Sequence, residues 1–105
     1  MTSVKFSVSN GKLIGFEISG HSSSSYNDEA GKIICSAVSS AAFMAANTLT
    51  EIIGAEVDAN VEDGYMFVKL ITKIPESQTV LKGLRLHLNE LAAQYSKHIQ
   101  VNQEV

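Results

Sequence analysis

The chain has 105 residues, of which 45% are apolar and 18% are charged. This composition is typical of one globular domain spanning residues 1–105 and argues against a disordered segment. The net charge of −3 gives no bulk attraction for phosphates, so we expect no direct nucleic-acid partner. The N-terminus lacks the apolar core of a signal peptide, and no apolar run approaches the ~18 residues that cross a bilayer. We therefore expect a cytoplasmic protein that binds no membrane.

The first twenty residues alternate between apolar and polar side chains, which predicts two half-buried strands. The apolar positions are Val4, Phe6 and Val8 in the first strand, and Ile14, Phe16 and Ile18 in the second. Asn10 and Gly11 lie between the strands, and both tolerate a positive φ. A type I′ hairpin turn is predicted there.

A polar loop from Ser19 to Lys32 precedes a stretch with helical spacing of apolar residues. These residues are Ile34, Val38, Ala41, Ala45, Leu49 and Ile52. The spacing predicts a first helix from about Ile33 to Ile53. Gly54 suits the position after the helix, because glycine accepts the left-handed conformation that often ends helices.

The second half repeats the pattern of hairpin and helix. Val57 to Val61 alternates as a strand, Asp63–Gly64 gives another type I′ signal, and residues 65–71 form a strand that is apolar on both faces. Such a strand is expected inside the sheet. An amphipathic helix follows Pro75, and residues 98–105 form a last strand. The order ββαββαβ predicts a single α+β domain with a mostly antiparallel five-stranded sheet and two helices.

The only cysteine, Cys35, is predicted in the first turn of the first helix, fourteen residues after His21. Free N–H groups and the helix dipole stabilise an anion at such a position. A histidine that loops back could act as the base of a Cys–His pair in acyl transfer. The backbone N–H groups of Cys35 and Ser36 would then hold the oxyanion of the reacting carbonyl. The alternative is a structural cysteine, since a lone cysteine is usually a small buried hydrophobe.

Other polar residues near Cys35 have both a chemical and a structural interpretation. Ser39 lies one helical turn after Cys35, where it could hydrogen-bond in a site or pack against a neighbouring element. Asp28 and Glu29 could orient His21 or simply cap the helix, and Tyr26 could shield the loop. The remaining histidines, His87 and His98, are expected to be solvated or structural. The histidines and the cysteine make no recognisable zinc spacing, so we expect no metal and no cofactor.

The segment from Gly20–His21 through a loop and a glycine to Ile33–Ser39 resembles the signature of the ribosomal-processing cysteine protease family, Prp. Chain length and element order also match that family. The resemblance implies a bacterial, cytoplasmic homodimer with Cys35 as nucleophile and His21 as general base. It also implies a peptide substrate, the N-terminal extension of large-subunit ribosomal protein twenty-seven. Ser39 matches the family's serine after the cysteine, which implies a supporting role.

Two positions depart from the family's signature. Lys32 stands where the family has an acid, three residues before the cysteine, and the glycine falls four residues before the cysteine and not five. Asp28 or Glu29 would have to replace the acid, although a Cys–His dyad can act without a third member. The competing hypothesis is a non-catalytic homodimeric module that binds a ribosomal protein or a ribosome assembly partner.

Overall fold

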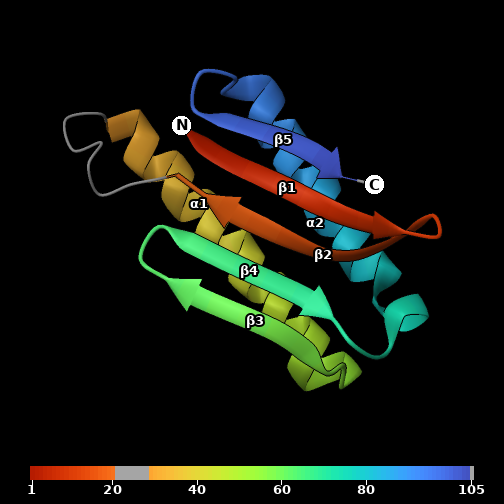
Figure 1. Ribbon diagram of the computed structural model, residues 1–105. Coiled ribbons are helices and arrows are strands. Elements are labelled where there is room, and N and C mark those ends of the chain that lie inside the picture. The colour runs from red at the N-terminus through yellow and green to blue at the C-terminus, as the bar shows by residue number, and fades with distance from the viewer. Residues whose placement is uncertain (21–28, 105) are drawn as a thin grey trace.

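A computed structural model describes residues 1–20 and 29–104 of the chain. The elements follow the order ββαββαβ, which confirms the predicted order (Figure 1). They are β1 (Thr2–Ser9), β2 (Lys12–Ser19), α1 (Glu29–Asn47) with its continuation η1 (Thr48–Ile53), β3 (Val57–Glu62), β4 (Tyr65–Leu70), α2 (Ile74–Gln94) and β5 (Ile99–Glu104).

The five strands form one sheet in the order β3-β4-β2-β1-β5. Three of its pairings are antiparallel and the β1–β5 pairing is parallel, so the prediction of a mostly antiparallel sheet is confirmed. The strand that is apolar on both faces, β4, is hydrogen-bonded on both sides and therefore lies inside the sheet, as predicted. Element order left open whether the helices share a face. Both cover the same face of the sheet (Figure 1).

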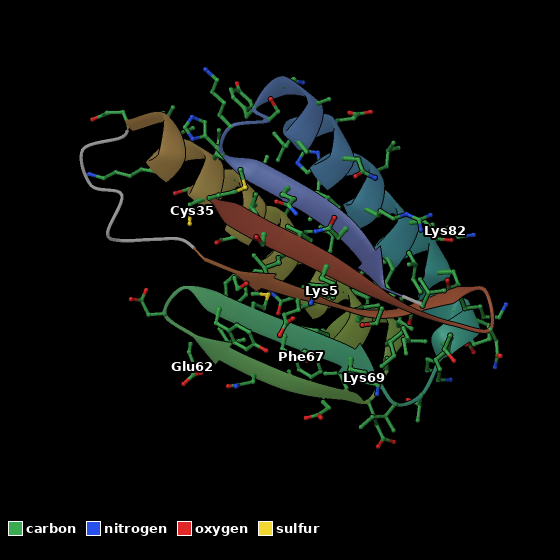
Figure 2. All side chains as sticks on the ribbon, turned by 45° about the horizontal axis from the view of Figure 1, so that its top comes forward. Lys5, Cys35, Glu62, Phe67, Lys69 and Lys82 are labelled. Carbon is green, nitrogen blue, oxygen red and sulfur yellow. The ribbon has the colours of Figure 1, made fainter. Side chains whose placement is uncertain are left out.

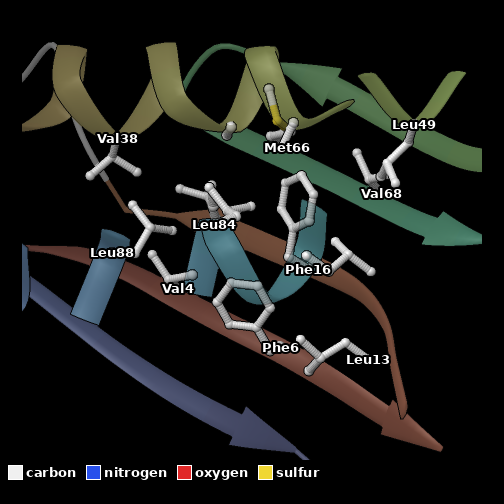
Figure 3. Packing of buried hydrophobic residues seen from close by; sticks show 14 of the residues in the cluster. Val4, Phe6, Leu13, Phe16, Val38, Leu49, Met66, Val68, Leu84 and Leu88 are labelled. Atoms are coloured by element: carbon white, nitrogen blue, oxygen red, sulfur yellow. The ribbon is translucent and has the colours of Figure 1, made fainter. Parts of the chain in front are cut away.

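The core lies between that face and the two helices (Figure 3). Aromatic and β-branched residues of the inner strands meet the apolar faces of α1 and α2. The fully buried large side chains there are Phe6, Phe16, Leu49, Leu81, Leu88, Ile99, Val4 and Val38. Burial of this kind is the main term that holds such a domain together.

A β-bulge changes one predicted position in the first hairpin. The register between β1 and β2 shifts between Ser7 and Val8, so that Val8 pairs with Leu13 while Ser7 pairs with Gly15. Ile14 is therefore the extra residue, and Leu13 is buried in the core instead. The predicted turn is confirmed in its essential feature, because Asn10 and Gly11 both have positive φ, 52° and 75°.

The second hairpin turn differs from its prediction. Glu62 pairs with Tyr65, so Asp63 and Gly64 are its two central residues. Gly64 has a φ of 75°, but Asp63 is not among the residues with positive φ. Type I′ requires positive φ at both central positions, whereas a positive φ at the second alone is the type II pattern. The type I′ assignment for Asp63–Gly64 is therefore wrong.

The first helix changes its winding near its end, where η1 is a π-helix. The hydroxyl of Thr48 donates to the Met44 carbonyl at 2.7 Å, and that of Thr50 donates to the Ala46 carbonyl at 3.2 Å. These bonds compete with the backbone pattern of the α-helix. Because a π-helix turns less per residue, the apolar stripe loses its phase. Ile52, predicted on the buried face, is 79% exposed.

The continuous helix Glu29–Ile53 has 25 residues and is apolar enough, by length and composition alone, to cross a bilayer. This finding differs from the expectation that no apolar run in the sequence is long enough to cross a bilayer. In the fold, the helix buries Ile34, Val38, Ala42 and Ala45 against the sheet. Its apolar composition is thus used in the core that it shares with the strands.

Candidate active site

Cys35 does not lie in the first turn of its helix, where the sequence predicted it. The helix α1 begins at Glu29, four residues earlier than expected, so Cys35 is its seventh residue and lies past the first turn. In an α-helix the N–H groups of Cys35 and Ser36 pair with the carbonyl oxygens of Gly31 and Lys32. The helix dipole also falls off beyond the first turn. The prediction that Cys35 lies in the first turn is therefore wrong. The argument for an oxyanion hole required N–H groups without an intrahelical partner, so it no longer applies to Cys35 and Ser36.

The thiol nevertheless lies on a cleft. Cys35 is half-buried and lines a cleft of about 250 Å³ between α1 and one end of the sheet. The α1 residues Cys35, Ser39 and Phe43 follow at intervals of four, which puts them on one side of the helix. The full lining is Thr2, Ile18, Ser19, Cys35, Val38, Ser39, Ala42, Phe43, Val61, Glu62, Asp63, Gly64, Tyr65 and Met66. A structural cysteine sealed in the core would not have this access.

Of the predicted site residues, the structure brings Cys35 and Ser39 to the same cleft. Ser39 is half-buried and follows Cys35 by one helical turn. His21, Asp28 and Tyr26 lie outside the described residues, so their roles stay predictions. Neither His87 nor His98 is among the residues that line the cleft.

The chain reaches the cleft from the end of β2. Ile18 and Ser19, the last two residues of that strand, both line it. Gly20 follows with a φ of +92°, and a Cβ atom placed there would come within 2.7 Å of the Met1 carbonyl oxygen. Glycine is therefore required for two reasons, the backbone conformation and the lack of space.

The turn between β3 and β4 forms the opposite wall of the cleft. Glu62, Asp63 and Gly64 line it from this side, and Figure 2 shows Cys35 and Glu62 toward the same end of the sheet. The Tyr65 hydroxyl donates to Glu17 Oε2 at 2.6 Å and so connects β4 to β2 next to the turn. This hydrogen bond to the Glu17 carboxylate raises the pKa of Tyr65 above its ordinary value.

The cleft includes residues that the sequence did not indicate. Phe43 lies two helical turns after Cys35, so helical spacing was the signal that could have identified it. Nothing in the spacing linked α1 to Val61 or to the Asp63–Gly64 turn, because their proximity depends on the strand order. Among residues 1–20 and 29–104, no three His, Cys, Asp or Glu side chains gather as a metal ion would require.

Residues 1–100 match the model of the family described as cysteine protease Prp. The chain belongs to the cysteine protease Prp family. The match covers nearly the whole chain, so the predicted resemblance and the assignment as a cysteine protease are confirmed. A search of curated protein sequences found no significant match.

Three solved structures have the same fold as this Prp family member. Prp from S. aureus in complex with a substrate peptide is 20% identical, with 99% of this chain and 100% of that chain covered, at a TM-score of 0.89. Prp from S. aureus in complex with a covalently linked product peptide is 22% identical over 99% and 100% of the two chains, at a TM-score of 0.83. SMU.848 from Streptococcus mutans is 23% identical over 98% and 93%, at a TM-score of 0.87.

Proposed function

We propose that this protein is a cysteine endopeptidase that uses Cys35 as its nucleophile and His21 as its general base. The observation that carries the proposal is the half-buried Cys35 on a cleft of about 250 Å³, in a chain of the Prp family. The proposed substrate is the N-terminal extension of bacterial large-subunit ribosomal protein twenty-seven. Support for a peptide substrate comes from S. aureus Prp, which has been solved with one.

The covalent connection of the chain supports the pairing of His21 with Cys35. Ser19 lines the same cleft as Cys35, and His21 follows Ser19 by two residues. Two residues span at most about 7 Å of extended chain. This short connection in the chain between Ser19 and His21 supports the proposal of a Cys35–His21 dyad.

In the proposed reaction, His21 takes the proton from the Cys35 thiol and the thiolate attacks the scissile carbonyl carbon. The protonated imidazole gives its proton to the leaving amine, and an acyl-enzyme thioester remains. Water then attacks this thioester, with His21 again accepting a proton, and the peptide product and the free thiol are released. Ser39, half-buried on the cleft one turn from Cys35, is the proposed hydrogen-bond donor to the developing oxyanion.

The test is cleavage of the N-terminal peptide of ribosomal protein twenty-seven, followed by mass spectrometry. We expect one cut with the wild type, none with Cys35→Ala or His21→Ala, and an unchanged rate with His87→Ala. His87 is the matched control, because it is exposed on α2 and does not line the cleft. Cleavage that persists in Cys35→Ala would contradict the proposal, and absence of cleavage by the wild type would favour the non-catalytic binding module.

The family resemblance also supports two proposals about the protein's setting. We propose that it acts as a homodimer and in the cytoplasm. Sedimentation equilibrium at micromolar concentration is expected to give twice the 11.3 kDa mass of the chain. A monomer at all concentrations tested would contradict the first of these proposals.

A further inference from the structure

A second concave surface lies on the outside of the helical layer, between α1 and α2. This interhelical groove has a volume of about 730 Å³ and is lined from both helices. Its α1 side includes Ala37, Ala41 and Ala45, which recur every four residues, and its α2 side includes Gly83. A Cβ atom placed on Gly83 would have no other atom within 4 Å. The groove is therefore open enough for the backbone of another chain to approach closely.

The interhelical groove is separate from the cleft that contains the thiol. Ala37 follows Cys35 by two positions, and Ala41 follows Ser39 by two. Residues two apart point to different sides of a helix. Among the described residues, none lines both the cleft and the groove. A ligand in the groove therefore leaves the cleft free.

Apolar side chains along the groove are exposed to solvent. Met44 lines it and is 66% exposed, and Ile33, one helical turn before Ala37, is 65% exposed. Val80 and Leu84 line it from α2. A flexible methionine beside an apolar groove is typical of surfaces that bind the apolar face of a helix.

Carboxylates border the groove. Among the described residues that line it, none is Lys, Arg, Asp or Glu. On α2, Glu76 precedes Val80 by four residues and Glu90 follows Gly83 by seven, which places both on the groove side of the helix. On the first helix, Glu51 is three residues after the last one that lines the groove. All three carboxylates belong to exposed residues.

The cations of α2 lie elsewhere. Lys82 and Arg85 follow the groove residues Val80 and Gly83 by two positions, and residues two apart do not share a side of a helix. Lys82 lies on the side of α2 that faces away from α1 (Figure 2). Lys73 precedes the helix. The groove thus combines an apolar lining with a negatively charged border.

We infer that the interhelical groove binds a basic amphipathic helix of a partner protein. Its apolar side chains would pack against Met44 and Gly83, and its lysines or arginines would face Glu76 and Glu90. The α1 lining extends over eleven residues, which is about 16 Å along the helix axis. Three turns of a partner helix have this length, so we expect its apolar anchors at positions i, i+4, i+7 and i+11.

A second copy of this chain has the wrong charge to fill the groove. In a symmetric dimer the same patch lies on both subunits, so a groove-to-groove contact would bring Glu76 and Glu90 toward their own copies. Like charges that face each other across an interface disfavour it. A basic helix meets the same border with opposite charge. This inference goes beyond the proposed peptidase function and does not depend on the reactivity of Cys35.

Fluorescence anisotropy of synthetic helical peptides tests the proposal. The protein is Cys35→Ala, so that no peptide is cut. The first of three blocked, fluorescein-labelled peptides carries leucine at i, i+4, i+7 and i+11 and lysine on its other face. The second has glutamate for each lysine, and the third has serine for each leucine. We expect saturable binding of the first, weakened by salt, and affinities about tenfold or more lower for the other two.

Substitutions on α2 locate the binding site. Gly83→Arg fills the groove and repels a cationic helix, while the open space and the better helix propensity of arginine keep the fold. We expect it to abolish binding. Ala93→Arg, which adds the same charge at an exposed α2 position outside the groove, should not. The double variant Glu76→Gln, Glu90→Gln should weaken binding about fivefold, whereas Asp58→Asn on β3 should leave it unchanged.

Equal binding of the lysine and glutamate peptides, binding that survives Gly83→Arg, or no binding of any peptide would overturn the proposal. A change from dimer to monomer in Gly83→Arg, measured by sedimentation equilibrium, would overturn it in favour of a second copy in the groove. The peptidase proposal is tested separately, because it fails only if the wild type does not cleave its peptide or cleaves it no better than Cys35→Ala.

Discussion

Replacing Gly20 by alanine tests whether the backbone conformation of Gly20, which lies between the cleft residue Ser19 and His21, is needed for stability and activity. Two effects add at this position. The φ of +92° is a conformation that L-residues rarely adopt, and it costs a non-glycine residue about 1–2 kcal/mol. The new Cβ atom would also lie 2.7 Å from the Met1 carbonyl oxygen, and such crowding costs about 1–3 kcal/mol. Because Met1 is 59% exposed and can shift, we expect a total loss of about 2–3 kcal/mol.

Gly11→Ala and Gly54→Ala are matched controls for Gly20→Ala. Their φ values are +75° and +80°, yet no atom lies within 4 Å of the position where a Cβ would stand, and neither residue lines the cleft. We expect urea unfolding to show a loss of about 1 kcal/mol in each control and a larger loss in Gly20→Ala. Peptide cleavage, measured where all variants are folded, should fall at least tenfold in Gly20→Ala only. Equal stability and activity among the three variants would refute the reasoning.

Three further changes test the fold and its pH dependence. Leu88→Ala opens a cavity at a fully buried position and should lower the free energy of unfolding by about 2–5 kcal/mol in urea titrations; less than 1 kcal/mol would contradict the described core. Gln78→Leu removes bonds of 2.9 and 2.8 Å to the backbone N–H and carbonyl of Leu13, and should cost about 1–3 kcal/mol, with a neutral effect as the contrary result. The raised pKa of Tyr65 in the folded state means that its contribution to stability is complete below pH 10 and is lost as the pH rises through the folded-state pKa. Wild-type stability should therefore fall more steeply than that of Tyr65→Phe above pH 10, and parallel curves would exclude a contribution from the Tyr65–Glu17 bond.

Local sequence patterns predicted most of the fold because they reflect preferences of residues that are close together in the chain. Alternating apolar residues fixed the strands, and the φ preferences of Asn10–Gly11 fixed the first turn. The errors lie where tertiary context decides. The bulge that buries Leu13 in place of Ile14 depends on pairing across the hairpin, and the exposure of Ile52 depends on the π-helical winding of η1.

The candidate site was only half predictable for a similar reason. Cys35 and Ser39 could be found from helical spacing and a family signature, because both belong to one element. The opposite wall comes from the turn at Asp63–Gly64 and from Val61, which reach α1 only through the strand order. The early start of α1 at Glu29 was missed because the polar residues and Gly31 resemble a loop.

The rate at which iodoacetamide alkylates Cys35 at pH 7 tests the proposed dyad most directly. It needs no knowledge of the substrate, and Cys35 is the only thiol in the chain. We predict rapid alkylation in the wild type and in His87→Ala, and alkylation at least tenfold slower in His21→Ala, because the base that activates the thiol is then gone. The same rate in all three proteins would contradict a Cys35–His21 dyad.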